Sequence, residues 1–282
     1  MATIQWFPGH MAKARTQVQE KLKFVDFVIE VVDARLPLSS RNPMLEKIIG
    51  TKPRLLILNK ADLAENTAEW LQFFGHALAV NSKEQITSKR VLKAAKLLLA
   101  DKIARNSERG IQNTVLRTMV IGIPNSGKST LLNTLAGKSS AKTGNKAGVT
   151  RAQQWIRSNK ELEIIDTPGI LWPRFEDQKV GLKLALTGAI KDDIYPQDDV
   201  AIFGLEFFLQ NYPERLEKLY GQLPGNSEEA IPDYIVGLTA KLGFRDAYER
   251  FYTRFITDVR NGKLGKFCLD RIEDLDSDDA DN

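Results

Sequence analysis

The stretch "VIGIPNSGKST" restricts the possible folds of this sequence more than any other. Gly122, Gly127, Lys128 and Ser129 follow the spacing G-x-x-x-x-G-K-[ST] of a phosphate-binding loop. An apolar run precedes the stretch and a helical pattern follows it, which is the strand–loop–helix context that such a loop requires. An ordinary glycine-rich turn is the alternative, and it does not account for this context. The sequence therefore predicts an α/β fold built around a phosphate-binding loop.

Each residue type in the loop has a chemical reason. Glycines let the backbone wrap a β-phosphate with its N–H groups pointing inward, and the following helix adds its dipole. Lys128 is expected to reach the β- and γ-phosphate oxygens, and the Ser129 hydroxyl to bind Mg²⁺. The residues predicted to contact a nucleotide here are Pro124, Asn125, Ser126, Gly127, Lys128, Ser129 and Thr130.

Short apolar runs alternate with helical patterns up to about residue 172, which is typical of a parallel sheet flanked by helices. After that point the period is helical and no strand is evident. Strands are predicted at 27–32, 54–58, 76–80, 117–121, 152–157 and 162–165, and helices at 11–23, 42–49, 64–74, 88–105 and 129–136. Later helices are predicted within 177–190, 197–212, 231–243 and 245–262.

The later segments predict a separate helical domain. Five aromatic residues recur there at three- and four-residue spacing, and we expect them to form a core instead of a base-stacking surface. They are Phe244, Tyr248, Phe251, Tyr252 and Phe255. The predicted organisation is an α/β domain with an N-terminal basic helix over 1–176, a small all-α domain over 177–272, and an acidic, disordered tail over 273–282.

The charge of the chain suggests a polyanionic partner. The net charge is +4 although the tail is strongly acidic, so the body is basic and favours RNA or DNA; a solvated basic surface is the alternative. One cysteine, Cys268, excludes an internal disulfide. Neither a secretory signal nor an apolar run of about 20 residues is present, which predicts a cytoplasmic protein without membrane contact. The basic side chains expected to neutralise phosphates are Lys13, Arg15, Lys21, Lys23, Arg250, Arg254, Arg260, Lys263 and Lys266.

Two further segments suit the γ-phosphate of a nucleotide. In "IIDTPGI", Asp166 is expected to hold Mg²⁺ through water, and the Gly169 N–H to meet the γ-phosphate, so that the following segment is ordered when that phosphate is present. Between this motif and the phosphate loop, Thr150 in "TGNKAGVTR" is the candidate for a second Mg²⁺ and γ-phosphate ligand. A simple loop threonine is the alternative for Thr150.

The stretch "LLILNKAD" predicts that the base is guanine. The Asp62 carboxylate can accept hydrogen bonds from guanine N1–H and the 2-amino group, whereas adenine would leave it unpaired. The Lys60 stem is expected to cover the base plane, and Asn59 to tie this loop to the phosphate loop. In the next loop, backbone N–H groups of Asn81, Ser82 and Lys83 can reach guanine O6.

Together these motifs resemble those of translation-factor-type GTPases, but their order differs. The base-reading motifs at 59–62 and 81–83 precede the phosphate loop, so we interpret the chain as a circularly permuted P-loop GTPase domain followed by the all-α domain. Permutation keeps the site because every motif follows the carboxyl end of a strand. Segment 106–113 would join the former ends. The D-T-P-G segment then runs into the helical domain, which suggests that nucleotide state moves residues from about 172 onward.

The segments "WFPGHMAKA" and "VVDARLPLSSRNP" resemble the ribosome biogenesis GTPase A family of bacteria and organelles. The resemblance covers essentially the whole chain. It implies GTP hydrolysis coupled to late assembly of the large ribosomal subunit, binding to ribosomal RNA, GTP or GDP and Mg²⁺ as cofactors, a monomer, and stimulation by the subunit.

Three residues bear on the hydrolytic step. Many GTPases carry glutamine after D-x-x-G, whereas this chain has Ile170, as in hydrophobic-substituted GTPases. Another group must then position water, and His10 is the candidate, with a surface or cap histidine as the alternative. Asn125 stands where potassium-activated GTPases hold K⁺ near the phosphates. The resemblance thus implies K⁺ as a third cofactor.

Two other functions are alternatives. The first is an RNA-binding module that uses GTP as a structural ligand, with negligible intrinsic turnover, and Ile170 keeps it open. The second is an ATP-dependent P-loop kinase. The pair of Lys60 and Asp62 argues against a kinase, as does the lack of an obvious lid or acceptor site.

Overall fold

The computed structural model describes residues 9–137, 155–158, 161–172, 175–221, 223–224 and 230–273. Two compact units can be distinguished. The α/β unit extends to residue 172 and takes up the chain again at Asp270, and the helical unit comprises residues 175–269. Among the described residues, no helix is both long and apolar enough to cross a membrane.

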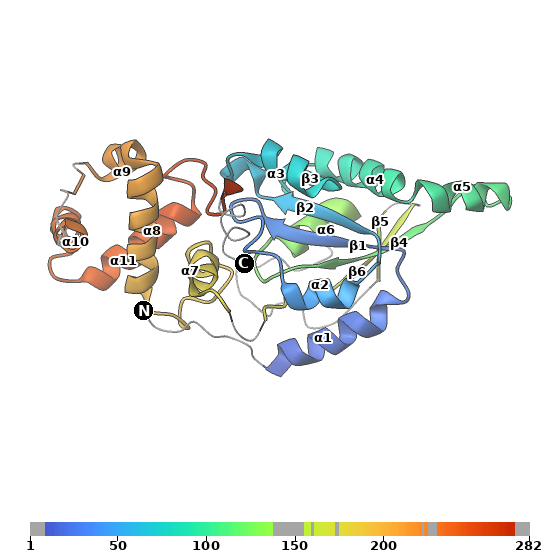
Figure 1. The fold of residues 1–282 in the computed structure, drawn as a ribbon, viewed down its shortest axis with the longest axis horizontal. Helices are drawn as coiled ribbons and strands as arrows, with labels where there is room; N and C mark the ends of the chain where they lie inside the picture. The colour runs from blue at the N-terminus through green and yellow to red at the C-terminus, as the bar shows by residue number, and fades with distance from the viewer. Residues whose placement is uncertain are drawn as a thin grey trace. The chain divides into compact units, whose positions relative to one another are not determined.

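The α/β unit contains a six-stranded sheet with the order β3-β2-β1-β4-β6-β5 (Figure 1). All neighbouring strands are parallel except β5, which is antiparallel to β6. The strands are β1 (Phe27–Asp33), β2 (Arg54–Asn59), β3 (Ala77–Val80), β4 (Leu116–Ile121), β5 (Trp155–Ser158) and β6 (Leu162–Asp166). The predicted mostly parallel sheet is confirmed. Residues 152–154, predicted to begin β5, lie outside the described part.

Helices cover both faces of this sheet, as a parallel sheet requires. They are α1 (Gly9–Leu22), α2 (Pro43–Ile49), α3 (Thr67–Phe74), α4 (Ile86–Leu98), α5 (Ala100–Glu108) and α6 (Lys128–Ala136), with a short 3₁₀ helix η1 (Ala61–Leu63). The prediction of one helix over 88–105 was wrong, because Leu99 (φ −112°, ψ 25°) leaves helical geometry and divides it into α4 and α5. The helix predicted from Ala64 begins later, since Asn66 is left-handed at φ 53°.

The core of the α/β unit is centred on β1, in which all seven residues are buried. Phe27, Ile29 and Val31 alternate along β1 and join one apolar cluster with Val91 of α4 and Leu131 of α6. In Figure 1, α1 and α2 lie on the other side of the sheet from α4. Burial on both faces explains why this strand is an almost continuous apolar run in the sequence.

The helical unit contains α7 (Gln178–Leu186), α8 (Gln197–Asn211), α9 (Pro213–Tyr220), α10 (Ala230–Lys241) and α11 (Tyr248–Arg260). The sequence patterns had not indicated α9, although Pro213 occupies a first-turn position that suits proline. Phe251 and Phe255 of α11 are fully buried, which confirms their predicted place in a core. Their three companions, Phe244, Tyr248 and Tyr252, are only partly buried.

Candidate functional site

The predicted site segments follow the carboxyl ends of strands at one edge of the sheet (Figure 1). β1 and β2 end in register, with Asp33 opposite Asn59, and β2 and β3 pair Asn59 with Val80. β4 leads into the phosphate loop and β6 ends at Asp166. Parallel strands thus bring together motifs that the chain separates widely.

The phosphate loop joins β4 to α6, which begins at Lys128. Gly122 (φ 147°), Asn125 (φ 57°) and Gly127 (φ 96°) all have positive φ. A Cβ on Gly122 would lie 2.3 Å from the Val31 carbonyl oxygen. A Cβ on Gly127 would lie 2.1 Å from Asn59 Nδ2. Both positions therefore need glycine, because the loop packs directly against β1 and the end of β2.

Lys128 is buried within this loop. Its Nζ donates to the Ile123 carbonyl at 2.7 Å, and Ser126 Oγ donates to the same oxygen at 3.1 Å. Ser129 and Thr130, in the first turn of α6, are partly exposed. The loop thus combines a held ammonium group, two partly exposed hydroxyl residues and a helix N-terminus, which suit the phosphates and Mg²⁺ of a nucleotide.

Asn59 connects the phosphate loop to the loop after β3. It is 2% exposed. Its Nδ2 donates to the Ser126 carbonyl at 2.8 Å, while its Oδ1 accepts from Ser82 N at 3.0 Å and Ser82 Oγ at 2.6 Å. Thr134 Oγ1 of α6 donates to the Ser82 carbonyl at 2.5 Å. The expected tie between these loops is present, and it includes Ser82.

The candidate base-reading residues lie beside this tie. Asp62 is exposed on η1, and Lys83 is exposed after β3. Lys83 N donates to Asn81 Oδ1 at 3.0 Å, which shapes the turn. Lys60 has a left-handed backbone, and its Nζ donates to Asp33 Oδ2 at 2.7 Å. The exposed Asp62 carboxylate is available to hydrogen-bond donors of a base.

The D-T-P-G segment packs on the phosphate loop. Thr167 Oγ1 donates to the Val120 carbonyl at 2.5 Å, and Ile170 N donates to the Gly122 carbonyl at 3.2 Å. A Cβ on Gly169 would lie 2.7 Å from Pro124 N and 2.9 Å from Lys128 Nζ. Glycine at 169 therefore allows the backbone to approach the place where Lys128 lies.

Asn42 also holds this segment, and the sequence reasoning missed it. Its Nδ2 donates to the Ile170 carbonyl at 2.8 Å, and its Oδ1 accepts from Met44 N at 3.0 Å as the cap of α2. An asparagine directly before a proline is a common helix start, so the cap was readable from the sequence. The contact with Ile170, 128 residues away, was not.

For three predicted residues, the side chain lies outside the described part of the structure. Thr150 lies in 138–154, outside the described residues. His10 belongs to α1 and Asp166 to β6, but the side chains of both lie outside the described part. Ile170 is 1% exposed, so its apolar side chain lies in the core. No group of three or more His, Cys, Asp or Glu side chains that could hold a metal occurs among the described residues.

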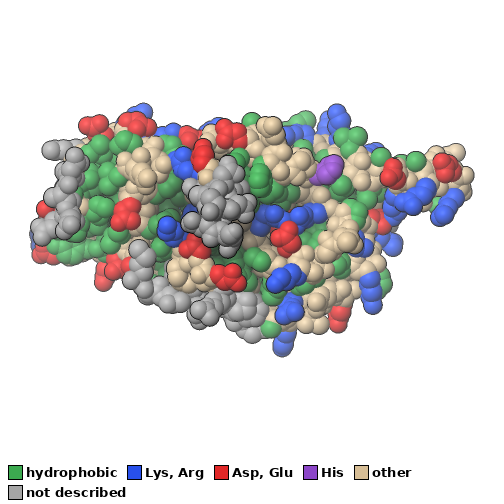
Figure 2. Space-filling model, in the orientation of Figure 1, with side chains coloured by type: hydrophobic (Ala, Val, Ile, Leu, Met, Phe, Trp, Pro, Cys, Tyr) green, Lys and Arg blue, Asp and Glu red, His purple; other side chains and the backbone are tan. Residues whose placement is uncertain are grey.

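The basic positions differ in their surroundings. Of those predicted to meet RNA, Arg254 and Lys263 both pair with buried Asp258 at 2.7 Å. Arg260 pairs with Asp192 at 2.8 Å and donates to backbone carbonyls at the end of α7. These three charges have intramolecular partners that hold the helical unit together. Figure 2 shows Lys and Arg side chains around α1 and α5, and Lys13, Arg15 and Lys23 are exposed there.

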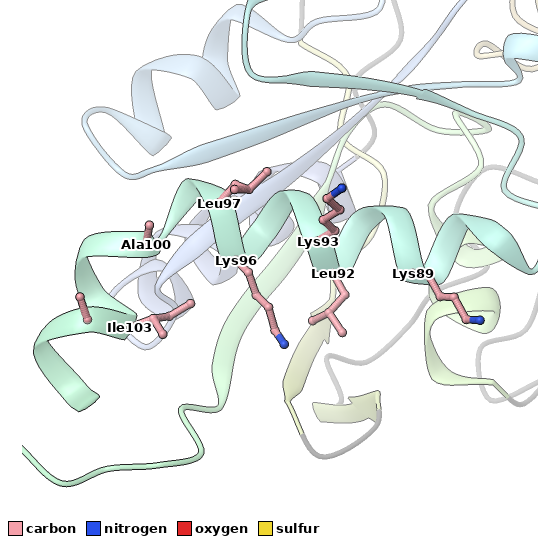
Figure 3. A pocket seen from close by; sticks show the side chains of 8 residues that line it. Lys89, Leu92, Lys93, Lys96, Leu97, Ala100 and Ile103 are labelled. Carbon is pink, nitrogen blue, oxygen red and sulfur yellow. The ribbon is translucent and has the colours of Figure 1, made fainter. Parts of the chain in front are cut away.

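A groove at the junction of α4 and α5 lies apart from these residues. Its volume is about 680 Å³. Figure 3 shows Leu92 and Lys96 projecting from the same side of α4, with Ile103 of α5 near them. The lining comprises Lys89, Leu92, Lys93, Lys96, Leu97, Ala100, Ile103 and Ala104. None of these was predicted to bind nucleotide.

Residues 117–221 match a protein-family model described as 50S ribosome-binding GTPase. Among known proteins, Ribosome biogenesis GTPase A of Bacillus cereus is 49% identical, over 96% of this chain and 95% of that protein. The Bacillus licheniformis protein of the same name is 48% identical over 96% of this chain and 99% of its own. Mitochondrial ribosome-associated GTPase 1 of Xenopus tropicalis is 35% identical, covering 94% of each chain.

Solved structures give the same picture of the fold. A GDP-bound structure of TM YlqF has a TM-score of 0.67 and 25% identity, covering 91% of this chain and 99% of that one. GNP-bound YlqF from T. maritima has a TM-score of 0.61 and 24% identity, covering 92% and 98%. The fold described above is therefore shared with known proteins.

Proposed function

Because this chain belongs to the ribosome biogenesis GTPase A family, we propose that it hydrolyses GTP to GDP and phosphate as an assembly factor in late maturation of the large ribosomal subunit. Family membership itself gives a GTPase with a role in ribosome biogenesis. The observation that carries the proposal is the contact of Asn59 with Ser126 at 2.8 Å and Ser82 at 3.0 Å. It assembles a phosphate loop and two base-reading loops into one site.

Guanine selectivity rests on Asp62. Its carboxylate is exposed at the edge of the sheet, where it can pair with N1–H and the 2-amino group of guanine. Backbone N–H groups of 81–83 are proposed to meet O6. An adenine nucleotide would offer no donor to the carboxylate, and the unpaired group would cost binding free energy.

The phosphates are proposed to lie between the phosphate loop and Gly169. Lys128 would exchange its hydrogen bond with the Ile123 carbonyl for contacts with β- and γ-phosphate oxygens. Mg²⁺, when bound, neutralises charge that develops on those oxygens. Ser129, Thr150 and Asp166 are the proposed groups around it, and Asn125 the proposed group for K⁺.

Ile170 bears on how water is activated. It is buried and carries no polar side-chain atom, so the attacking water needs another group. We assign this role to His10, which lies in the first turn of α1 and belongs to the same unit. If the large ribosomal subunit brings His10 into place, GTP hydrolysis is slow in the isolated protein and faster when the subunit is bound.

The order of motifs supports circular permutation. The family model matches from residue 117, so the base-reading segments lie before the matched region. With this order the D-T-P-G segment leads directly into the helical unit, which is the proposed reader of nucleotide state. The exposed cations of α1 are the proposed contacts with ribosomal RNA.

The test is GTP hydrolysis in K⁺ and in Na⁺ buffer, with and without purified large ribosomal subunits. We expect strong stimulation by subunits, faster turnover in K⁺, and loss of stimulation in His10→Ala with GTP binding retained. Nucleotide-dependent subunit binding without turnover would favour a nucleotide-gated RNA-binding module instead. If the chain showed no subunit binding and no GTP turnover, the assignment to the large subunit would be refuted.

A further inference from the structure

A largely buried charged cluster links the base-reading loop to the end of β1, and two of its three members have no role in the function proposed above. It consists of Asp33 and Arg35, from the segment "VVDARLP", and Lys60, from "NKAD". Asp33 is 3% exposed and Arg35 is 2% exposed, whereas the Lys60 side chain is 26% exposed. The cluster therefore has two interior members and one that faces the nucleotide edge.

The Asp33 carboxylate accepts four hydrogen bonds. Oδ1 accepts from Arg35 N at 3.1 Å and from Arg35 Nε at 2.9 Å. Oδ2 accepts from Arg35 Nη2 at 2.8 Å and from Lys60 Nζ at 2.7 Å. Four donors are about what two carboxylate oxygens can accommodate. Asp33 is therefore rigidly oriented by Arg35, and it holds the Lys60 ammonium from a fixed position.

The strands place these residues together. Asp33 ends β1 in register with Asn59 at the end of β2, and Ala34 N donates to the Asn59 carbonyl at 2.8 Å. Lys60 follows directly, with φ 60° and ψ 35°. This left-handed conformation is unfavourable for a residue with a Cβ. The contact with Asp33 helps to offset that strain and fixes the position of the Lys60 ammonium group.

The charge balance argues against a merely structural cluster. Arg35 alone neutralises Asp33 with paired hydrogen bonds from Nε and Nη2. Burial by itself would raise the pKa of Asp33, but the charges of Arg35 and Lys60 hold that pKa well below its usual range. A second cation is not needed to keep the pair neutral. What the Lys60 contact adds is a defined position for a lysine at the nucleotide edge.

We propose that Asp33, oriented by Arg35, is a positioning residue for guanine-nucleotide recognition that fixes the Lys60 stem where it covers the base plane. The inference rests on the proposed function, because it takes the base to lie beside Asp62. Lys60 touches the base plane, which hypoxanthine shares with guanine, and Asp62 reads the 2-amino group. Asp33 therefore affects how strongly a purine nucleotide binds, but not the preference for guanine over hypoxanthine.

The test is a double-mutant cycle on the full chain, using fluorescent GDP and IDP titrations. Asp33→Asn alone leaves the Arg35 charge unpaired and can fail to fold, so Asp33→Asn with Arg35→Gln supplies a neutral hydrogen-bonded pair. This double variant is compared with Lys60→Gln and with the triple variant that combines all three substitutions. Glu161→Gln, which breaks the exposed pair with Lys96, is the control for loss of an ion pair far from the site.

We expect the double variant to bind GDP about tenfold more weakly, as for the loss of a hydrogen bond to a charged group, with an unchanged GDP-to-IDP ratio. In the Lys60→Gln background the same change should have no further effect. Equal losses in both backgrounds, or wild-type affinity in the double variant, would overturn the inference. If the wild-type chain itself binds ADP as well as GDP, the proposed function fails instead.

Discussion

Asn59→Asp is a precise test of the contact that assembles the site. The change replaces Nδ2 by an oxygen and keeps the volume of the side chain. Oδ1 can still accept from Ser82 N and Ser82 Oγ, which lie 3.0 and 2.6 Å from it in the native chain. The new oxygen faces the Ser126 carbonyl, which accepts from Nδ2 at 2.8 Å in the native chain. The substitution therefore breaks the link to the phosphate loop and leaves the link to the next loop.

The size of the effect follows from burial. Asn59 is 2% exposed, so water cannot replace the lost donor. A lost hydrogen bond costs about 1 kcal/mol, and leaving the buried Ser126 carbonyl unsatisfied costs about 1–3 kcal/mol more. We expect a total of at least about 2 kcal/mol, divided between the free energy of unfolding and the free energy of nucleotide binding. If all of it appeared in binding, Kd for GDP would rise roughly thirtyfold.

The assay combines urea unfolding with GDP titration at pH 8 and pH 5.5. Burial and the facing carbonyl should raise the pKa of the new carboxyl above its unfolded value. Its protonated form can donate to Ser126, so the loss should be smaller at the lower pH. Asn106→Asp is the matched control, because Asn106 Nδ2 donates to the Thr114 hydroxyl at 3.1 Å, and a hydroxyl can reverse its role. Wild-type stability and wild-type GDP affinity at pH 8 would refute the reasoning.

Four further predictions concern stability, measured by urea or thermal unfolding of the full chain. Asp270 accepts three hydrogen bonds from residues 38 and 39, two of them from backbone N–H groups at 2.8 Å. Asp270→Asn should therefore lower the free energy of unfolding by about 1–3 kcal/mol, and an unchanged urea midpoint would contradict this. Gly204→Ala should lower the free energy of unfolding by about 1–3 kcal/mol, because its Cβ would lie 2.8 Å from a ring atom of buried Phe255 in α11. Gly237→Ala is the control: its Cβ would have nothing within 4 Å, so it should stabilise α10 by about 0.5–1 kcal/mol. Burial raises the pKa of Glu30 above its ordinary value of 4.5 despite two nearby arginines, so the free energy of unfolding falls as pH rises above that value. Glu30→Gln should therefore gain stability relative to the wild type as pH is raised from about 4.5, and a relative loss over that rise would contradict this. The pKa of Asp33 is lowered from 3.8, so the stability that its carboxylate contributes is present above about pH 4 and is lost as pH falls further. The double variant Asp33→Asn with Arg35→Gln should therefore lose less stability than the wild type at acid pH, and an equally steep loss would contradict this.

Local chemistry explains why much of the fold could be predicted from the sequence. Each motif combines a strand, a turn and a helix within about ten residues, so its glycines and its apolar run indicate both the element and the edge where it ends. The loop with Gly122 and Gly127, the end of β2 at Asn59 and the D-T-P-G segment were all found in this way. The link between Asn59 and the phosphate loop was also predictable, because parallel strands end together.

The interactions that hold these motifs in place were decided by tertiary structure. Asp33 meets Lys60 because β1 and β2 pair in register. Asn42 meets Ile170, and Asp270 returns to Ser39. The residues around each of these side chains in the sequence do not indicate which distant residue it will contact, so no local pattern could predict these pairs.

The same reason limits what a run of basic residues can predict. Arg254, Arg260 and Lys263 form part of a basic run in the sequence, yet the structure gives each of them an acidic partner. A charge run shows how many cations a segment carries, whereas the folded chain determines which of them pair with carboxylates. The sequence by itself thus determined the chemical groups and the strand ends that carry them. The tertiary structure decided which groups face one another, because those distances depend on how separate elements pack.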